Sequence, residues 1–107
     1  MEPWPEIFEH KVIDLDKSKI EYQLPTPNSL ELILSSPKAL INDKFEIILK
    51  TKTEGEASFI FSYTVSSYFD KEQAKQEYDR CFKILKSGNY KIKFFINNNR
   101  AEIMQTH

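Results

Sequence analysis

Residues 70–95, DKEQAKQEYDRCFKILKSGNYKIKFF, change from a helical period to a strand period at one glycine. Asp70 suits a helix N-cap, and Gln73 completes a capping box three residues later. Apolar residues then recur at the spacing of one helix face: Ala74, Tyr78, Cys81, Phe82 and Leu85. Gly88 favours the left-handed conformation that ends a helix. Beyond it, apolar residues alternate with Lys91 and Lys93, so the stretch predicts an amphipathic helix followed by a strand.

Alternation of apolar and polar residues also marks strands elsewhere in the chain. The predicted segments are residues 12–15, 20–24, 30–35, 45–52 and 57–66 before the helix, and 90–96 and 101–104 after it. Short loops join the early strands, which favours antiparallel pairing of neighbours. The predicted fold class is therefore α+β: an antiparallel meander sheet of about seven strands with one amphipathic helix packed on one face. A curled sheet or partial barrel is the variant.

The length and composition predict one folded domain with a short arm. Apolar residues make up 40 % of the 107 residues, which is enough for a small core. Residues 1–10 hold Pro3 and Pro5 and show no period, so we expect an irregular N-terminal arm before a single α+β domain at residues 11–107. One cysteine and no apolar run long enough to span a bilayer favour a cytoplasmic protein without membrane contact.

Catalytic and cofactor motifs are missing from the sequence. The two histidines, His10 and His107, lie in the arm and at the last position, and the one thiol, Cys81, falls within the apolar helix face. These residues provide no nucleophile with a neighbouring base and no metal-ligand spacing. Gly55 and Gly88 suit a turn and a helix end, so no phosphate-binding glycine loop is present. We therefore expect no enzymatic activity, no cofactor and no metal.

Between residues 80 and 100 the chain carries six basic residues and no acid, although its net charge is −1. Such a bias is typical of nucleic-acid binding. The residues expected to contact single-stranded nucleic acid are Lys91, Lys93, Arg100 and Asn98. The helical and strand periods divide the stretch, however. The helical bases face solvent, whereas Lys91 and Lys93 project from the far side of the sheet, so nucleic-acid binding is the alternative hypothesis.

The leading hypothesis is a small non-enzymatic protein-interaction module of the inhibitor, immunity or adaptor type. Phe95 shares a strand face with the two lysines, and Ile48 and Ile60 interrupt the polar face of the 45–66 hairpin. The predicted partner-binding surface is therefore formed by Lys91, Lys93, Phe95, Ile48 and Ile60. A partner protein or a second copy would bind this sheet face or a sheet edge, and we expect the strand at 100–106 to form an edge.

Two further possibilities follow from the same pattern. The acidic N-terminal arm, with Trp4, Ile7 and Phe8, would cover the face of Phe95 and complement its lysines. A pocket between helix and sheet would instead make the chain a small-ligand binder or an enzyme. The tyrosines expected to line such a pocket are Tyr22, Tyr63 and Tyr78.

Overall fold

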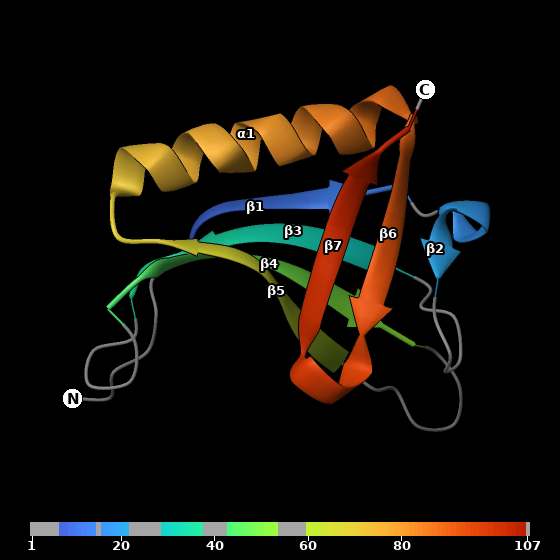
Figure 1. The fold of residues 1–107 in the computed structure, drawn as a ribbon, viewed down its shortest axis with the longest axis horizontal. Helices are drawn as coiled ribbons and strands as arrows, with labels where there is room; N and C mark the ends of the chain where they lie inside the picture. The colour runs from blue at the N-terminus through green and yellow to red at the C-terminus, as the bar shows by residue number, and fades with distance from the viewer. Residues whose placement is uncertain (1–6, 15, 22–28, 38–42, 54–59, 107) are drawn as a thin grey trace.

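One α-helix lies across a twisted sheet in the part of the chain that the computed structural model describes, residues 7–14, 16–21, 29–37, 43–53 and 60–106 (Figure 1). The helix, α1, spans Lys71–Ser87. The strands are β1 (Ile7–Ile13), β2 (Ile20–Glu21), β3 (Ser29–Ser35), β4 (Phe45–Lys52), β5 (Ile60–Tyr68), β6 (Tyr90–Phe95) and β7 (Arg100–Gln105). Two 3-10 turns, η1 and η2, occupy Lys17–Lys19 and Ile96–Asn98. The predicted α+β class and the order of five strands, one helix and two strands are confirmed.

The seven described strands form one open, mixed sheet in the order β1-β3-β4-β5-β7-β6-β2. β1, β3, β4 and β5 pair antiparallel in that order. The pairing of β3 with β4 and of β4 with β5 follows the prediction, whereas β1 pairs with β3 and not with β2, its neighbour in the chain. β7 runs parallel to β5, and β2 runs parallel to β6, so the prediction of a purely antiparallel meander is wrong. The sheet is not closed into a barrel, because β1 and β2 lie at its opposite ends.

The position of β7 is the second difference from the sequence prediction. We expected residues 100–106 at a sheet edge, but β7 lies between β5 and β6. α1 carries the chain from the end of β5 to the start of β6 at the other end of the helix (Figure 1). The β6–β7 hairpin then returns the chain into the space between those strands. The alternation of apolar and polar residues cannot reveal the position of β7, because it indicates which face of the sheet a residue occupies and not which strand lies beside it.

Both ends of α1 follow the predicted capping chemistry. The Asp70 carboxylate accepts hydrogen bonds from the backbone N–H groups of Glu72 and Gln73, both at 3.4 Å. Gly88 ends the helix with φ of 81°, and its N–H donates to the Leu85 carbonyl. The turn after β6 also follows expectation, since Asn99 adopts a left-handed conformation with φ of 52°.

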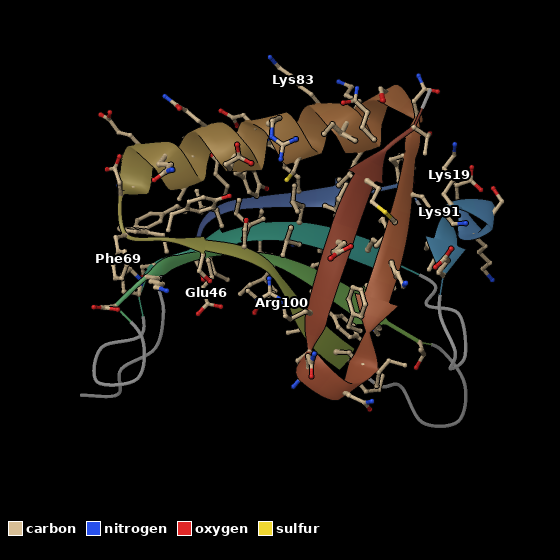
Figure 2. All side chains as sticks on the ribbon, in the orientation of Figure 1. Lys19, Glu46, Phe69, Lys83, Lys91 and Arg100 are labelled. Atoms are coloured by element: carbon tan, nitrogen blue, oxygen red, sulfur yellow. The ribbon has the colours of Figure 1, made fainter. Side chains whose placement is uncertain are left out.

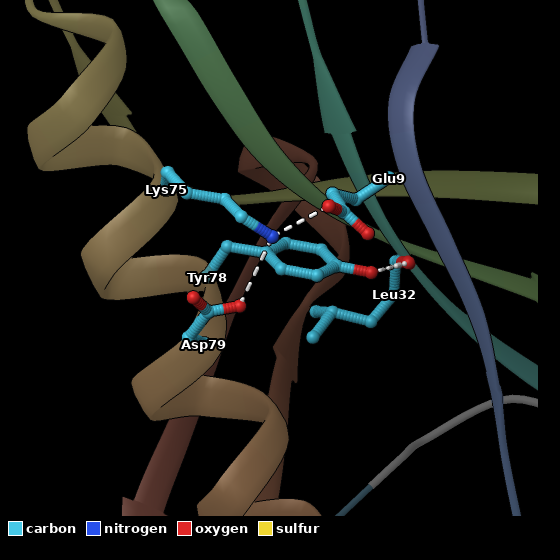
Figure 3. Close-up of polar contacts among 5 residues, drawn as sticks. All are labelled: Glu9, Leu32, Lys75, Tyr78 and Asp79. Atoms are coloured by element: carbon cyan, nitrogen blue, oxygen red, sulfur yellow. Dashed lines mark hydrogen bonds and ion pairs between the residues drawn. The ribbon is translucent and has the colours of Figure 1, made fainter.

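The apolar face of α1 is buried against the sheet and held there by one hydrogen bond. Tyr78 is fully buried, and its hydroxyl donates to the Leu32 carbonyl of β3 at 2.7 Å (Figure 3). Burial raises the pKa of this hydroxyl, so it remains a donor at all physiological pH values. The largest fully buried residues of the core are Tyr63, Tyr78, Leu30, Leu32, Leu34, Ile47, Leu49 and Ile92.

β1 includes part of the segment that we expected to be irregular. The strand begins at Ile7, so residues 7–10 belong to the sheet. Phe8 packs against Phe45 of β4, with 6.0 Å between ring centroids, and the Lys71 ammonium lies 4.2 Å from the centroid of the Phe8 ring. These contacts lie at the start of α1 and far from β6, so Phe8 does not cover the face of Phe95. Residues 1–6, including Trp4, lie outside the described residues.

We predict that Tyr78→Phe lowers the free energy of unfolding by about 1–2 kcal/mol, because it leaves the buried Leu32 carbonyl without its donor. Urea titration followed by fluorescence measures the loss. Tyr90→Phe is the control, since Tyr90 is also buried but its hydroxyl makes no hydrogen bond to the described residues. Equal losses in the two variants would contradict the anchoring role of Tyr78.

Candidate interaction surface

The five residues predicted to bind a partner all lie on the sheet face opposite α1, called the far face below. Three of the five lie on β6, where Lys91, Lys93 and Phe95 alternate with the buried residues Tyr90, Ile92 and Phe94. Ile48 and Ile60 are likewise out of phase with the residues that β4 and β5 bury under α1. Ile60 is 57 % exposed, whereas Ile48 and Phe95 are half-buried.

The far-face residues form a broad surface and not one tight cluster. The register aligns Ile48 with Thr64, Thr64 with Arg100, and Arg100 with Phe95. β5 and β7 therefore stand between Ile48 and Phe95, which places the two side chains about 14 Å apart at the usual strand spacing. The apolar residues are consequently interspersed with polar and charged ones.

Among the described residues, the acidic partner of Lys91 comes from β2. The Lys91 ammonium lies 2.8 Å from Glu21 Oε1. This hydrogen bond lowers the pKa of Glu21. Glu9, the described acid of the expected arm, instead binds Lys75 of α1 at 2.5 Å. The other arm acids, Glu2 and Glu6, lie outside the described residues.

Two of the four predicted nucleic-acid contacts, Lys93 and Asn98, line a hollow at the η2 turn. The hollow has a volume of about 300 Å³ and is lined by Lys93, Phe94, Phe95, Ile96, Asn97 and Asn98. The Lys93 ammonium lies 5.3 Å from the centroid of the Phe95 ring. Arg100 is adjacent in register to Phe95, whereas Lys91 is held by Glu21. Figure 2 places Lys83 on the outer side of α1, away from the sheet.

A cavity of about 340 Å³ lies at the C-terminal end of α1, although Tyr63 and Tyr78, which were expected to line a pocket there, do not line it. Its residues are Val12, Ile13, Asp14, Asp16, Lys19, Phe82, Leu85, Lys86, Gly88 and Tyr90. Tyr63 and Tyr78 are buried in the core, and Tyr22 lies outside the described residues. Lys19 donates to the Gly88 carbonyl. Asp16 accepts from Ser18, which lowers the pKa of Asp16. Two of the cavity's charges therefore serve local structure.

A cleft between β5 and β7 was not predicted from the sequence. Among the described residues, these strands pair only at Thr64 and Arg100, where the Thr64 N–H donates to the Asn99 carbonyl at 2.8 Å. Beyond that point they diverge toward opposite ends of α1 (Figure 1). The resulting cleft of about 240 Å³ is lined by Val65, Ser66, Tyr68, Glu77, Arg80, Cys81, Ala101, Glu102, Ile103 and Met104.

Polar groups from α1 and β5 organise one wall of this cleft. Arg80 donates to Glu77 through Nε at 3.0 Å and through Nη2 at 2.8 Å. These hydrogen bonds, together with one from Tyr68, lower the pKa of Glu77. Cys81 lies beneath them, and burial raises the pKa of its thiol, which keeps it protonated and unreactive. The cleft therefore has a polar rim on a chemically inert floor.

The described residues offer neither a metal-binding group nor a membrane-spanning helix. In those ranges no three His, Cys, Asp or Glu side chains lie close enough together to hold a metal ion. No α-helix there is long and apolar enough to cross a bilayer. The chain matches no protein-family model, no curated protein and no solved structure.

We predict that Glu77 contributes to acid sensitivity. Its pKa is lowered by folding, so its stabilising contribution is complete above its usual pKa of 4.5 and is lost as the pH falls through the lower value of the folded state. Urea titrations of wild type and Glu77→Gln across this pH range measure the effect. The variant should lose less stability on acidification than wild type, and parallel curves would contradict the prediction.

Proposed function

We propose that this chain is a small non-enzymatic protein-interaction module, of the inhibitor, immunity or adaptor type, that receives an extended segment of a partner protein between β5 and β7. The observation that supports this most strongly is the divergence of these strands after Thr64 and Arg100. It leaves the facing edges of the two strands, at residues 65–68 of β5 and 101–104 of β7, unpaired among the described residues, while their other edges pair with β4 and β6. Between these edges lies a hollow that is already formed.

Strand addition suits such a site because main-chain hydrogen bonds supply affinity and side-chain pockets supply specificity. Val65, Ile103 and Met104 offer apolar contact, and Met104 is 37 % exposed. Arg80 is 60 % exposed beside its Glu77 partner and offers charged contact at the rim. An extended peptide therefore fits the cleft better than a compact small molecule does.

The far face extends this interface. Lys91, Lys93 and Phe95 on β6 lie directly opposite three β7 residues, which are Met104, Glu102 and Arg100. Two of these, Met104 and Glu102, line the cleft. A partner held in the cleft would therefore rest its body on Phe95 and, across β5, on Ile48 and Ile60. We place the module in the cytoplasm, where Cys81 would stay reduced.

Photo-crosslinking tests this assignment. In one variant, a photoreactive benzophenone amino acid replaces Met104 at the cleft. In the matched control variant, it replaces the exposed Lys83 on the outer side of α1. In the native host, we expect one adduct of defined mass from position 104 and none from position 83. Phe95→Asp should reduce the adduct while the circular dichroism spectrum stays unchanged. Equal labelling from both positions, or no adduct from position 104, would rule the cleft out.

The hollow at η2 favours a second candidate function, the binding of single-stranded nucleic acid. Lys93 supplies charge, Phe95 supplies a stacking surface, and Asn98 supplies hydrogen-bonding groups within one hollow. Fluorescence anisotropy with a labelled oligonucleotide at low salt tests it. If this function holds, affinity falls steeply with added salt and falls further in Lys93→Glu, whereas Lys83→Glu has little effect. Unchanged anisotropy at low salt would eliminate this candidate.

A further inference from the structure

β1 is an outermost strand whose outer edge has no strand partner among the described residues. An unpaired edge is a template for a strand from another chain, and proteins usually blunt it with proline, short length or charge. β1 has seven residues and no proline; it carries a β-bulge and the charged residues Glu9 and Lys11, which are opposite in sign. Its Ile7 and Val12 side chains are 58 % and 69 % exposed, which is unusual for large apolar residues. The edge therefore carries both the backbone and the side chains of an interface.

The sequence of β1, IFEHKVI, is complementary to itself. If two copies pair antiparallel about a two-fold axis at His10, Glu9 of each copy lies opposite Lys11 of the other. Cross-strand pairs of opposite charge stabilise such pairing, and like charges oppose it. Because the axis repeats every contact, the match occurs twice. Shifting the axis by one residue to Lys11 would instead place like charges opposite each other.

A β-bulge at Phe8 changes which side chains of the two copies would lie opposite each other. The register between β1 and β3 shifts between Ile7 and Glu9. Phe8 packs on Phe45 and Glu9 binds Lys75, so two successive side chains lie on the α1 side of the sheet. Ile7 therefore returns to the far face. In the two-fold pair, Ile7 of each copy then lies opposite Val12 of the other, and the exposed apolar residues of β1 cover one another.

We propose that two copies of this chain associate through β1, forming one continuous antiparallel sheet across a two-fold axis at His10. A two-fold interface must be self-complementary, and β1 meets this condition in both charge and apolar character. The bulge shortens the regular ladder, so the dimer dissociates on dilution. This interface is independent of the cleft between β5 and β7, which lies elsewhere in the sheet.

The charged groups on the α1 side are placed to accept the second copy. One carboxylate oxygen of Glu9, Oε1, binds Lys75, which also contacts Asp79 at 3.3 Å (Figure 3). The other, Oε2, has no partner among the described residues. The Lys11 ammonium lies 4.1 Å from the centroid of the Phe82 ring. Each pair across the axis therefore brings a carboxylate with a free oxygen together with an ammonium that has no carboxylate partner in the described structure.

Sedimentation equilibrium over a range of concentrations tests the proposal, with two charge variants and their mixture. Lys11→Glu gives an edge with two acids, and Glu9→Lys gives an edge with two bases. We expect wild type to dimerise, each variant alone to be monomeric, and the equimolar mixture to recover a dimer, because Glu then lies opposite Lys in both pairs. Phe95→Asp, at the other end of the sheet, is the control and should dimerise as wild type does.

The outcomes separate this interface from any other. A wild type that stays monomeric at every concentration overturns the proposal, as does a Lys11→Glu variant that dimerises with unchanged affinity. Urea titration of each variant confirms that the monomer remains folded. If a charge variant unfolds, Val12→Asp replaces it, since Val12 is exposed and its change should weaken the dimer without affecting the core. Loss of partner binding at the cleft would leave this dimer unaffected.

Discussion

Burial of the apolar face of α1 is the constraint on which the rest of the structure depends. The helix supplies one layer of a two-layer core, and Tyr78 ties it to β3 through a buried hydrogen bond. Its 17 residues make it about 25 Å long. It therefore carries the chain across the sheet before β6 can begin. That displacement separates β5 from β6 and creates the space that β7 enters.

The candidate cleft is a consequence of the same displacement. β7 pairs with β5 at one point and then continues alongside β6. The reason is that β6 begins at the C-terminal end of α1, so the open end of the β6–β7 hairpin lies there (Figure 1). Two basic side chains around the candidate surface are paired with acids: Arg80 at the cleft with Glu77, and Lys91 on β6 with Glu21. This local pairing is one reason why we propose a protein partner for the cleft in preference to a polyphosphate backbone.

The candidate site could be predicted in part. Strand period placed Lys91, Lys93 and Phe95 on the far face, because alternate residues of a strand must point to opposite sides. The same reasoning failed to find the cleft, since its walls come from three elements whose contact is decided by packing. It also missed the Lys91–Glu21 pair, because β2 and β6 are joined by no local turn. Pairings between distant segments leave no periodic trace in the residues.

The sequence by itself determined where α1 begins and ends and most of its buried face, although Phe82 is only half-buried and the buried Ile84 was not predicted. These features depend on local backbone chemistry, such as the Asp70 cap and the positive φ of Gly88. Only the tertiary structure decided the strand order, the insertion of β7 beside β5, and the exposure of β1 at the sheet edge. Each of these depends on how a single helix and a twisted sheet share one core, which no local pattern encodes.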